Sequence, residues 1–559
     1  MKPKFRWTWL AAIAASNAAW AAPAHYVVFE MDAAKNVRAL FYTQVDIADA
    51  ALERARDAQP AGEERIAYRL VRDGVGRGER SVEVPSLRAE FARDPDRGDQ
   101  RIVARPVDAA VRHFVLRVPL ADADTVEFGD AGKTQRFDLH ELASREQTTT
   151  YAGRTPMQIE RAPNAGNPAN RVDMLVIGEG YTAAQQGLFD SDAAILRESF
   201  FGLTPYKEYQ SFVNWTTGFV ASNQSGADHP PYQSGCTQAT CCSDPEAQSD
   251  PRAGQFVDTA FDATFCAFQI HRLLTVDDGA VLAAAAAYPD WDKIVVVVND
   301  PVYGGAGGNI STTSTHAQAT QIVLHEYGHS FTGLADEYDS PYPGFPPCSD
   351  LSGGAPCEAN VTDQTSASSV KWKSWFTPGN PIPTPPGTSG VGLFEGARYR
   401  SSGMFRPVDT QCLMQFLGVP FCPVCAQEYV RTLYRGGFGV PAGGIDLIEP
   451  GSESPPTSGV VAYGLGSSRT FQVSTLQPTI GSIAVQWYLD GAAISGANAA
   501  SYVFSQGSPT PATRTLEVRV TDSTALVSPT MAGGLLEHRR SWTIQVGNDV
   551  IFRNGFESP

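Results

Sequence analysis

Residues 322–338 read IVLHEYGHSFTGLADEY. His325 and His329 are four positions apart, so on a helix their imidazoles project from one face about one turn apart. Two neutral imidazoles at this spacing can bind one Zn²⁺, and Glu326 can act as general base toward a water molecule activated there. The pattern therefore predicts a helix over residues 316–331 that carries a zinc site.

A third ligand is expected shortly after this helix. Gly333 can adopt the left-handed conformation that ends a helix and turns the chain. The turn can bring Asp336 back to the metal. Glu337 and the more distant Glu358 are the alternatives for this position.

The residues HEYGH at 325–329 and GLADEY at 333–338 resemble the signature of the IgA-peptidase family of metzincin-like zinc metallopeptidases. Most metzincins have a glycine three residues after the second histidine and a third histidine three beyond it. Here the glycine comes one residue later, and Asp336 stands in the ligand position. The resemblance implies a metzincin-like α/β peptidase domain with a methionine turn beneath the zinc. Met414 matches that turn, and Met404 is the alternative.

The net charge of the chain argues against some classes of binding partner. Its 559 residues contain 43 Lys and Arg against 60 Asp and Glu, a formal net charge of −17. An acidic chain without a basic stripe is a poor candidate for binding nucleic acid or an anionic membrane surface. We expect protein or peptide substrates and a monomer.

The N-terminus has the layout of a secretory signal peptide. A basic start is followed by LAAIAASNAAWA, which ends in Ala-Trp-Ala and predicts cleavage after Ala21. No later run reaches the roughly 18 to 20 apolar residues that span a bilayer. The sequence thus predicts export, to the medium, the periplasm or the cell surface, and no integral membrane segment.

All nine cysteines lie in the middle of the chain, which in an exported protein favours disulfides. We expect four disulfides and one remaining cysteine. Cys422-Pro-Val-Cys425 could instead be half of a zinc knuckle, but no second pair has a matching spacing. The nine positions are Cys236, Cys241, Cys242, Cys266, Cys348, Cys357, Cys412, Cys422 and Cys425.

Chain length and hydrophobic patterning predict a multidomain protein of the α+β class. We predict a signal peptide (1–21), an N-terminal β-sandwich-like domain (22–150), a zinc peptidase domain (160–437) and a Pro/Ser-rich linker with few contacts (438–458). An immunoglobulin-like or PKD-like β-sandwich (459–548) and a short tail (549–559) complete the chain. The N-terminal domain contains no cysteine, so it cannot block a zinc in the way a cysteine-switch propeptide does.

Two further features of the middle segment bear on function. The run IVVVV at residues 294–298 predicts a strand buried on both faces. In metzincins the strand before the zinc helix borders the cleft and pairs with an extended peptide, so the resemblance implies this role for the run and the glycine-rich loop after it. Asp228 and His229 could form a second metal pair, although a turn is the simpler interpretation, and His316 should point away from the zinc.

These observations predict a secreted zinc endopeptidase with His325, His329 and Asp336 as ligands and Glu326 as base. The family name implies immunoglobulin A as one candidate substrate, whereas the motif reports zinc chemistry and not the choice of substrate. A zinc amidase or esterase is the alternative within enzymes. A catalytically inactive surface-binding protein is the alternative outside them.

Overall fold

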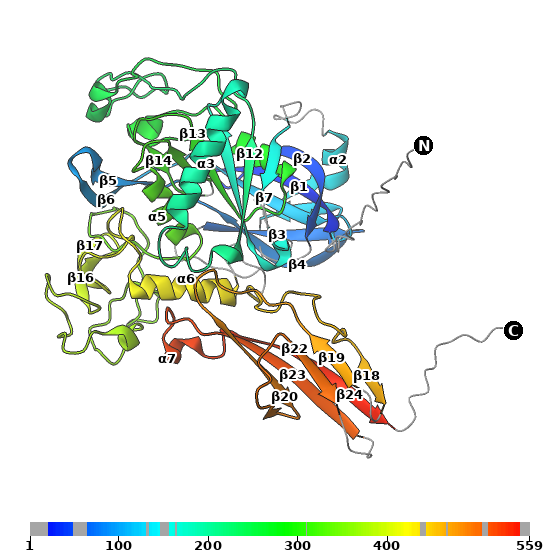
Figure 1. Ribbon diagram of the computed structural model, residues 1–559. Helices are drawn as coiled ribbons and strands as arrows, with labels where there is room; N and C mark the ends of the chain where they lie inside the picture. The colour runs from blue at the N-terminus through cyan, green and yellow to red at the C-terminus, as the bar shows by residue number, and fades with distance from the viewer. Residues whose placement is uncertain are drawn as a thin grey trace, which may run out of the picture.

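The computed structural model describes residues 21–48, 64–129, 134–145, 156–162, 165–308, 310–436, 443–464, 468–505 and 512–547. N-terminal strands, a central sheet with helices and a C-terminal lobe of strands follow one another along the chain (Figure 1). The prediction of a multidomain chain with mixed α and β structure is confirmed at this level. The predicted tail, and the predicted signal peptide except Ala21, lie outside the described residues.

Two antiparallel sheets form the N-terminal part, with strand orders β2-β1-β7 and β4-β3-β8-β9. Side chains from both sheets, among them Phe29, Phe114 and Phe128, share one buried core, as in sheets that pack face to face. A hairpin of β5 and β6 leaves this part and reaches the region of helix α5 (Thr320–Ser330; Figure 1). The elements are β1 (Ala21–Asp32), β2 (Val37–Ala48), β3 (Glu64–Arg72), β4 (Val75–Val84), β5 (Ala89–Asp94), β6 (Asp99–Arg105), β7 (Val111–Pro119), β8 (Thr125–Phe128), β9 (Gln135–Asp138) and α2 (Leu139–Ser144).

The central sheet has six strands in the order β10-β12-β11-β13-β15-β14. The inner strands β12, β11, β13 and β15 are parallel, whereas β10 and β14 are antiparallel edges. The elements of this part are β10 (Gln158–Arg161), β11 (Val172–Glu179), α3 (Gln186–Phe200), β12 (Val213–Phe219), α4 (Asp278–Ala284), β13 (Lys293–Val298), β14 (Gly305–Ala306), β15 (Ile310–Ser314), α5 (Thr320–Ser330), β16 (Phe394–Ala397), β17 (Arg400–Arg406) and α6 (Pro423–Arg435).

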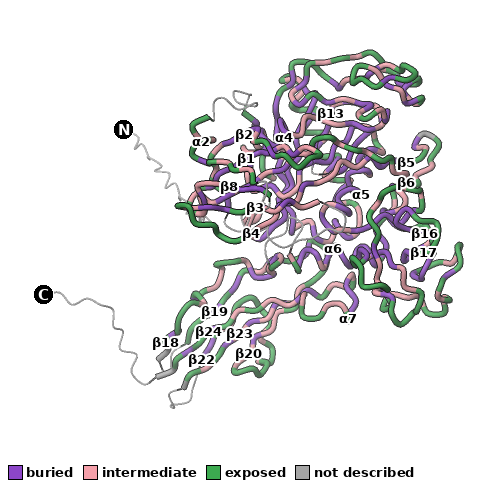
Figure 2. Tube along the Cα trace, turned by 180° about the vertical axis from the view of Figure 1, so that it is seen from behind, coloured by how far each residue is buried: buried purple, intermediate pink, exposed green. Residues whose placement is uncertain are grey.

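Strand β13 is buried on both faces, as its run of β-branched residues predicts. Val295 and Val297 face the core that contains residues of α3 and α5. Val296 faces the core that contains residues of α4 and of β1. The N-terminal strands and α4 therefore cover one face of the central sheet, whereas α3 and α5 cover the other. Figure 2 shows buried residues concentrated along β13, α5 and α6.

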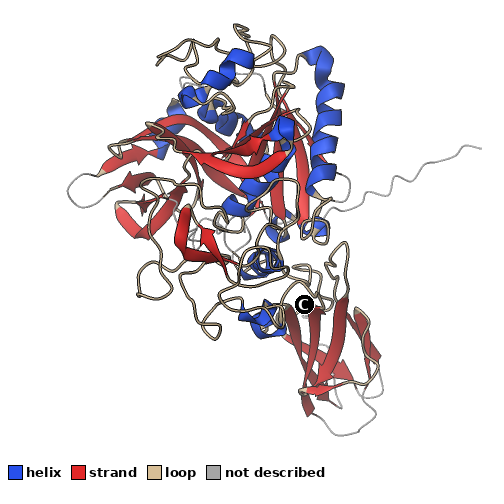
Figure 3. Cartoon of the chain, turned by 90° about the vertical axis from the view of Figure 1, so that its left-hand side faces the viewer, coloured by secondary structure: helices blue, strands red, loops and turns tan. Residues whose placement is uncertain are grey.

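The C-terminal lobe consists of a five-stranded sheet, β18-β24-β23-β20-β21, and the pair β19-β22. Trp487 and Trp542 are fully or almost fully buried in its core and stack with ring centroids 5.5 Å apart. Figure 3 shows these strands as a lobe that extends away from the rest of the chain. The elements are β18 (Val460–Gly464), β19 (Ser468–Gln472), β20 (Ile483–Leu489), β21 (Ala492–Ala493), β22 (Ser501–Ser505), β23 (Ala512–Asp522), α7 (Pro529–Ala532) and β24 (Glu537–Gly547).

The expectation that the chain crosses to this lobe with few contacts is wrong. Ile445, Leu447 and Ile448, within the predicted linker, have no exposed surface. Asp522 of the lobe accepts hydrogen bonds from the hydroxyls of Tyr209 (2.6 Å) and Tyr434 (2.8 Å). The Pro/Ser-rich composition predicted an exposed linker, but these three apolar side chains pack in the core that connects the central part with the C-terminal lobe.

The cysteine prediction also needs correction. Three disulfides form instead of four, and three cysteines remain unpaired and buried, namely Cys412, Cys422 and Cys425. The disulfides join Cys236 to Cys241, Cys242 to Cys266, and Cys348 to Cys357. None of the helices in the described part has the length and apolar composition needed to cross a membrane.

Candidate metal centre

Helix α5 places both histidines of the motif inside the protein. It begins at Thr320 and not at the predicted His316, whose ring accepts a hydrogen bond from the Gln318 N–H in the preceding turn. His325 and His329 are 1% and 5% exposed, and their Nε2 atoms lie 3.1 Å apart. The i, i+4 spacing thus brings the two imidazoles to one point, and His316 contacts Tyr303 instead.

The other ring nitrogen of each histidine faces a backbone carbonyl. His325 Nδ1 lies 3.1 Å from the oxygen of Leu413, and His329 Nδ1 lies 2.7 Å from the oxygen of Leu334. A carbonyl can only accept, so each Nδ1 carries a hydrogen and donates. Such second contacts orient histidines as metal ligands, with Nε2 directed at the ion.

The turn after α5 returns an acid to this point. Gly333 has φ +67°, and the chain then brings Asp336 Oδ1 to 3.4 Å from His325 Nε2 and 3.3 Å from His329 Nε2. Oδ1 accepts no hydrogen bond from the described residues, whereas Oδ2 accepts one from the Tyr399 hydroxyl. A buried carboxylate oxygen without a donor, beside two imidazole nitrogens, is a donor set that fits Zn²⁺.

The two alternatives for the third ligand lie elsewhere. Glu337 points away from the histidines and lies against Asn360 and Cys425. Glu358 forms a two-pronged ion pair with Arg398. Of the three acids considered from the sequence, the structure brings only Asp336 to the histidines.

Without a cation, negative charge around the histidines controls their protonation. Burial alone would lower the pKa of His325, but the carboxylates of Asp336 and Glu90 raise it to about 9. The pKa of His329 is raised for the same reason. A divalent cation bound at this point would displace these protons, because metal ligands must be deprotonated.

Glu326 is buried and lies beside the glycine-rich edge of the sheet. Neither of its carboxylate oxygens has a hydrogen-bond partner among the described residues. A Cβ atom at Gly307 would lie 1.9 Å from Glu326 Oε2, so only glycine leaves room for this carboxylate. Burial, together with the negative charge of Glu90, raises the pKa of Glu326 to about 8. A carboxylate with a raised pKa and no fixed partner is suited to accept a proton.

The methionine predicted for the turn lies under α5. Met414 is fully buried, and its Sδ would be 2.8 Å from a Cβ at Gly328, between the two histidines on the helix. The alternative, Met404, lies in a separate buried cluster with the disulfide cysteines Cys348 and Cys357. The structure thus brings Met414, and not Met404, beneath the histidines.

Glu90 is a site residue that the sequence analysis missed. It lies on β5 of the N-terminal part, is 3% exposed, and places Oε2 3.0 Å from His325 Nε2 and 3.3 Å from His329 Nε2. Its Oε1 accepts a hydrogen bond from the Tyr338 hydroxyl (3.1 Å) and lies 3.3 Å from the Tyr399 hydroxyl, whose one hydrogen also faces Asp336. Burial alone would raise the pKa of Glu90, but the two imidazoles hold it well below its usual value. No local pattern could reveal this contact, because 235 residues separate Glu90 from His325.

The backbone next to Glu90 pairs with the edge of the central sheet. Arg88 and Gly307 exchange two hydrogen bonds, N to O at 2.9 Å and 3.0 Å, in an antiparallel bridge. This is the manner in which an extended peptide adds to an exposed strand edge. A cavity of about 220 Å³ adjoins this segment and is lined by Glu90, Tyr342, Phe345 and Tyr399 among others.

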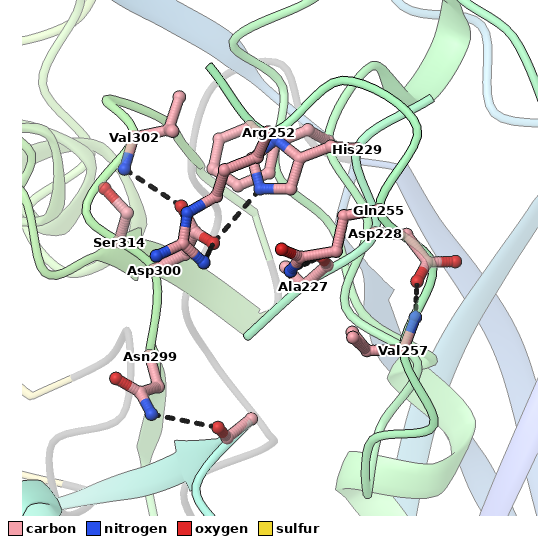
Figure 4. Close-up of polar contacts among 12 residues, drawn as sticks. Ala227, Asp228, His229, Arg252, Gln255, Val257, Asn299, Asp300, Val302 and Ser314 are labelled. Carbon is pink, nitrogen blue, oxygen red and sulfur yellow. Dashed lines mark hydrogen bonds and ion pairs between the residues drawn. The ribbon is translucent and has the colours of Figure 1, made fainter. Parts of the chain in front are cut away.

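The second metal pair suggested by the sequence does not form among the described residues. Asp228 accepts a hydrogen bond from the Val257 N–H, whereas the ring of His229 lies between Asp250 (2.8 Å) and Asp300 (3.1 Å), as Figure 4 shows in part. The two side chains therefore point to different partners. His229 belongs to a buried ion network that includes Arg252, which fits a structural role.

Residues 161–389 match the family model described as IgA Peptidase M64. The matched range contains His325, Glu326, His329 and Asp336, ends before Met414, and supports a peptidase.

Other comparisons add no argument. No curated protein matches the chain. Among solved structures, a quinonprotein alcohol dehydrogenase-like protein from Bacteroides thetaiotaomicron is similar over 18% of this chain, at 12% identity and a TM-score of 0.13. The chain covers 19% of that protein, and a similarity at this level carries no information on fold or function.

Proposed function

We propose that this chain is an exported zinc endopeptidase whose active site is covered by its own N-terminal part. The observation that carries the proposal is the convergence of His325 Nε2, His329 Nε2 and Asp336 Oδ1, with the unpaired carboxylate of Glu326 beside them. The three disulfides fit an oxidising compartment. The family match supports the peptidase class.

In the proposed reaction, His325, His329 and Asp336 would hold a zinc ion. Zn²⁺ in such a site polarises a carbonyl and lowers the pKa of water to about 7. Glu326 accepts the proton of the attacking water and transfers it to the leaving amine. The carbonyls of Leu413 and Leu334 keep the two imidazoles in place, and the Tyr399 hydroxyl does the same for Asp336.

The edge at Gly307 is where we place the substrate backbone. Arg88 already pairs there as an extended peptide would, and Glu90, two residues on, contacts both histidines. Glu90 together with the three proposed ligands makes a set of four, whereas catalytic zinc sites keep one position open. The segment around residues 86–90 must therefore move away before a protein substrate can be cleaved.

Casein zymography with and without a chelator tests the proposal. We expect a cleared band that the chelator abolishes and that added zinc restores. Cleavage of esters or simple amides without cleavage of any protein would favour the amidase or esterase alternative. A protein that stays inactive even after Glu90→Ala would favour the surface-binding alternative.

A further inference from the structure

The three unpaired cysteines lie together with Glu337 in a second cluster. Cys412, Cys422 and Cys425 are at most 1% exposed, and Glu337 has no exposed surface. One ligand atom from each of the four residues lies within 4.8 Å of the others. The cluster shares no residue with the group formed by Glu90, the two histidines and Asp336.

We propose that Cys412, Cys422, Cys425 and Glu337 bind a second, structural Zn²⁺. The Cys412 and Cys425 sulfurs are 3.6 Å apart, and Glu337 Oε1 lies 3.1 Å from the Cys425 sulfur and 3.9 Å from that of Cys422. Tetrahedral bonds of about 2.3 Å to sulfur and about 2.0 Å to oxygen place sulfurs roughly 3.8 Å apart, and sulfur and oxygen roughly 3.5 Å apart. These three separations differ by at most about 0.4 Å from the values for one zinc ion, and all four ligand atoms lie within 4.8 Å of one another.

The chain supplies the supports that thiolate ligands need. Cys422 is the N-cap of α6, and its sulfur accepts a hydrogen bond from the Cys425 N–H at 3.5 Å. The Cys422 N–H in turn donates to the Cys412 sulfur at 3.5 Å. Backbone donors and the positive end of a helix both stabilise sulfur in its thiolate form.

Glu337 is difficult to explain without a cation. Its Oε1 accepts a hydrogen bond from Asn360 Nδ2 at 3.0 Å, but its Oε2 is buried and has no hydrogen-bond partner among the described residues. Arg406 interacts electrostatically with Glu337, while its guanidinium donates to backbone carbonyls at residues 395, 396, 408 and 409. A charged carboxylate buried beside three sulfurs is costly, and either a bound proton or a metal ion can neutralise it; only the ion also gives Oε2 and the three sulfurs a common partner.

A disulfide is the competing explanation, and it leaves the cluster incomplete. Any bond between two of the three sulfurs leaves one thiol and the Glu337 carboxylate facing each other in the interior. The other six cysteines all form disulfides, whereas these three lie together without forming one. The zinc knuckle considered for residues 422–425 lacked a second cysteine pair in the sequence, and here Cys412 and Glu337 complete it.

The second ion would connect two segments that also contribute to the proposed active site. Cys412 lies two residues before Met414, and Glu337 directly follows Asp336. The Glu337 N–H donates to the Met414 oxygen at 2.8 Å, so the two segments are already adjacent. An ion shared between them would fix Asp336 and the turn at residues 412–414 relative to each other.

Metal analysis of the full-length protein tests this inference separately from the peptidase proposal. We expect two zinc ions per chain in the wild type and one in Asp336→Ala, because the sulfur site does not need Asp336. Replacement of zinc by cobalt should give the near-ultraviolet band of sulfur-to-cobalt charge transfer, which histidine and carboxylate ligands do not produce. That band should persist in Asp336→Ala and disappear in Cys422→Ser.

Two further measurements keep the test decisive if Cys422→Ser fails to fold. Alkylation of the denatured wild type in the presence of a chelator, without reductant, should modify Cys412, Cys422 and Cys425. The double variant Cys348→Ser and Cys357→Ser, which removes a disulfide instead, should retain both zinc ions. A disulfide among the three cysteines, or cobalt-substituted wild type without the charge-transfer band, would overturn the proposal, whatever the peptidase activity.

Discussion

Replacing Glu90 by alanine should open the covered site and raise peptidase activity. Glu90 Oε2 lies 3.0 and 3.3 Å from the two imidazole Nε2 atoms, so it would face an ion bound there. We assign this contact the free energy of one hydrogen bond to a charged group, about 1.5–3 kcal/mol. Because one oxygen makes both contacts, we count only one of them. At 1.4 kcal/mol per factor of ten, its loss shifts the balance between covered and open forms by roughly 10- to 150-fold.

The assay is cleavage of an internally quenched peptide by the full-length protein. We expect kcat/KM to rise at least about tenfold in Glu90→Ala. The backbone pairing of Arg88 with Gly307 remains in this variant and limits the rise, because it still holds the segment over the site. Glu79→Ala removes an exposed carboxylate from β4 of the same N-terminal part and should leave the rate unchanged. Zinc content should also stay unchanged, since Glu90 is not one of the three proposed ligands.

One result would refute the reasoning about Glu90. If Glu90→Ala folds as the wild type does but loses zinc from the histidine site and shows no gain in activity, Glu90 is a permanent ligand. The site would then be closed by four protein groups, and the inactive alternative would gain support.

Three more outcomes follow from the structure. Glu326→Gln should lower kcat by several orders of magnitude while zinc content and melting temperature hold, because an amide cannot accept the proton; a near-normal rate would exclude Glu326 as base. Asp336→Ala and Glu337→Ala should each lose one zinc ion per chain, from different sites, and a variant that loses both or neither would show that the assignment is wrong. Asp522→Ala leaves two buried tyrosine hydroxyls without an acceptor and should destabilise the protein by about 2–4 kcal/mol, seen as a lower melting temperature; an unchanged melting temperature would mean that the C-terminal lobe is attached more loosely than its contacts indicate.

Local spacing predicted the parts of the site that lie close together in the sequence. The i, i+4 histidines and the turn at Gly333 depend on helix geometry and on a single positive φ, and both can be recognised from residue types. The burial of β13 on both faces follows equally from its β-branched run. In each case the physical cause acts over a few residues.

Contacts between distant segments were not predictable in this way. Glu90 lies in a short hairpin strand without any metal-ligand spacing around it, and only the packing of that hairpin against α5 gives it a role. The sequence around the three unpaired cysteines does not distinguish them from the disulfide-bonded cysteines. What distinguishes them is the contact with Glu337, which comes from another segment of the chain. The apolar residues at 445, 447 and 448 stand beside a Pro/Ser-rich stretch that predicts a linker, yet they are buried in a core shared with the C-terminal lobe.

The central claim is that a zinc ion held by His325, His329 and Asp336 makes this chain a peptidase with Glu326 as its base. The most direct test strips the metal from Glu90→Ala and from the double variant Glu90→Ala and Glu326→Gln, and follows peptide cleavage while zinc is added back. Cleavage should return in the first protein and stay absent in the second, although both take up the same amount of zinc. Cleavage by the stripped protein, or equal recovery in both, would contradict the account.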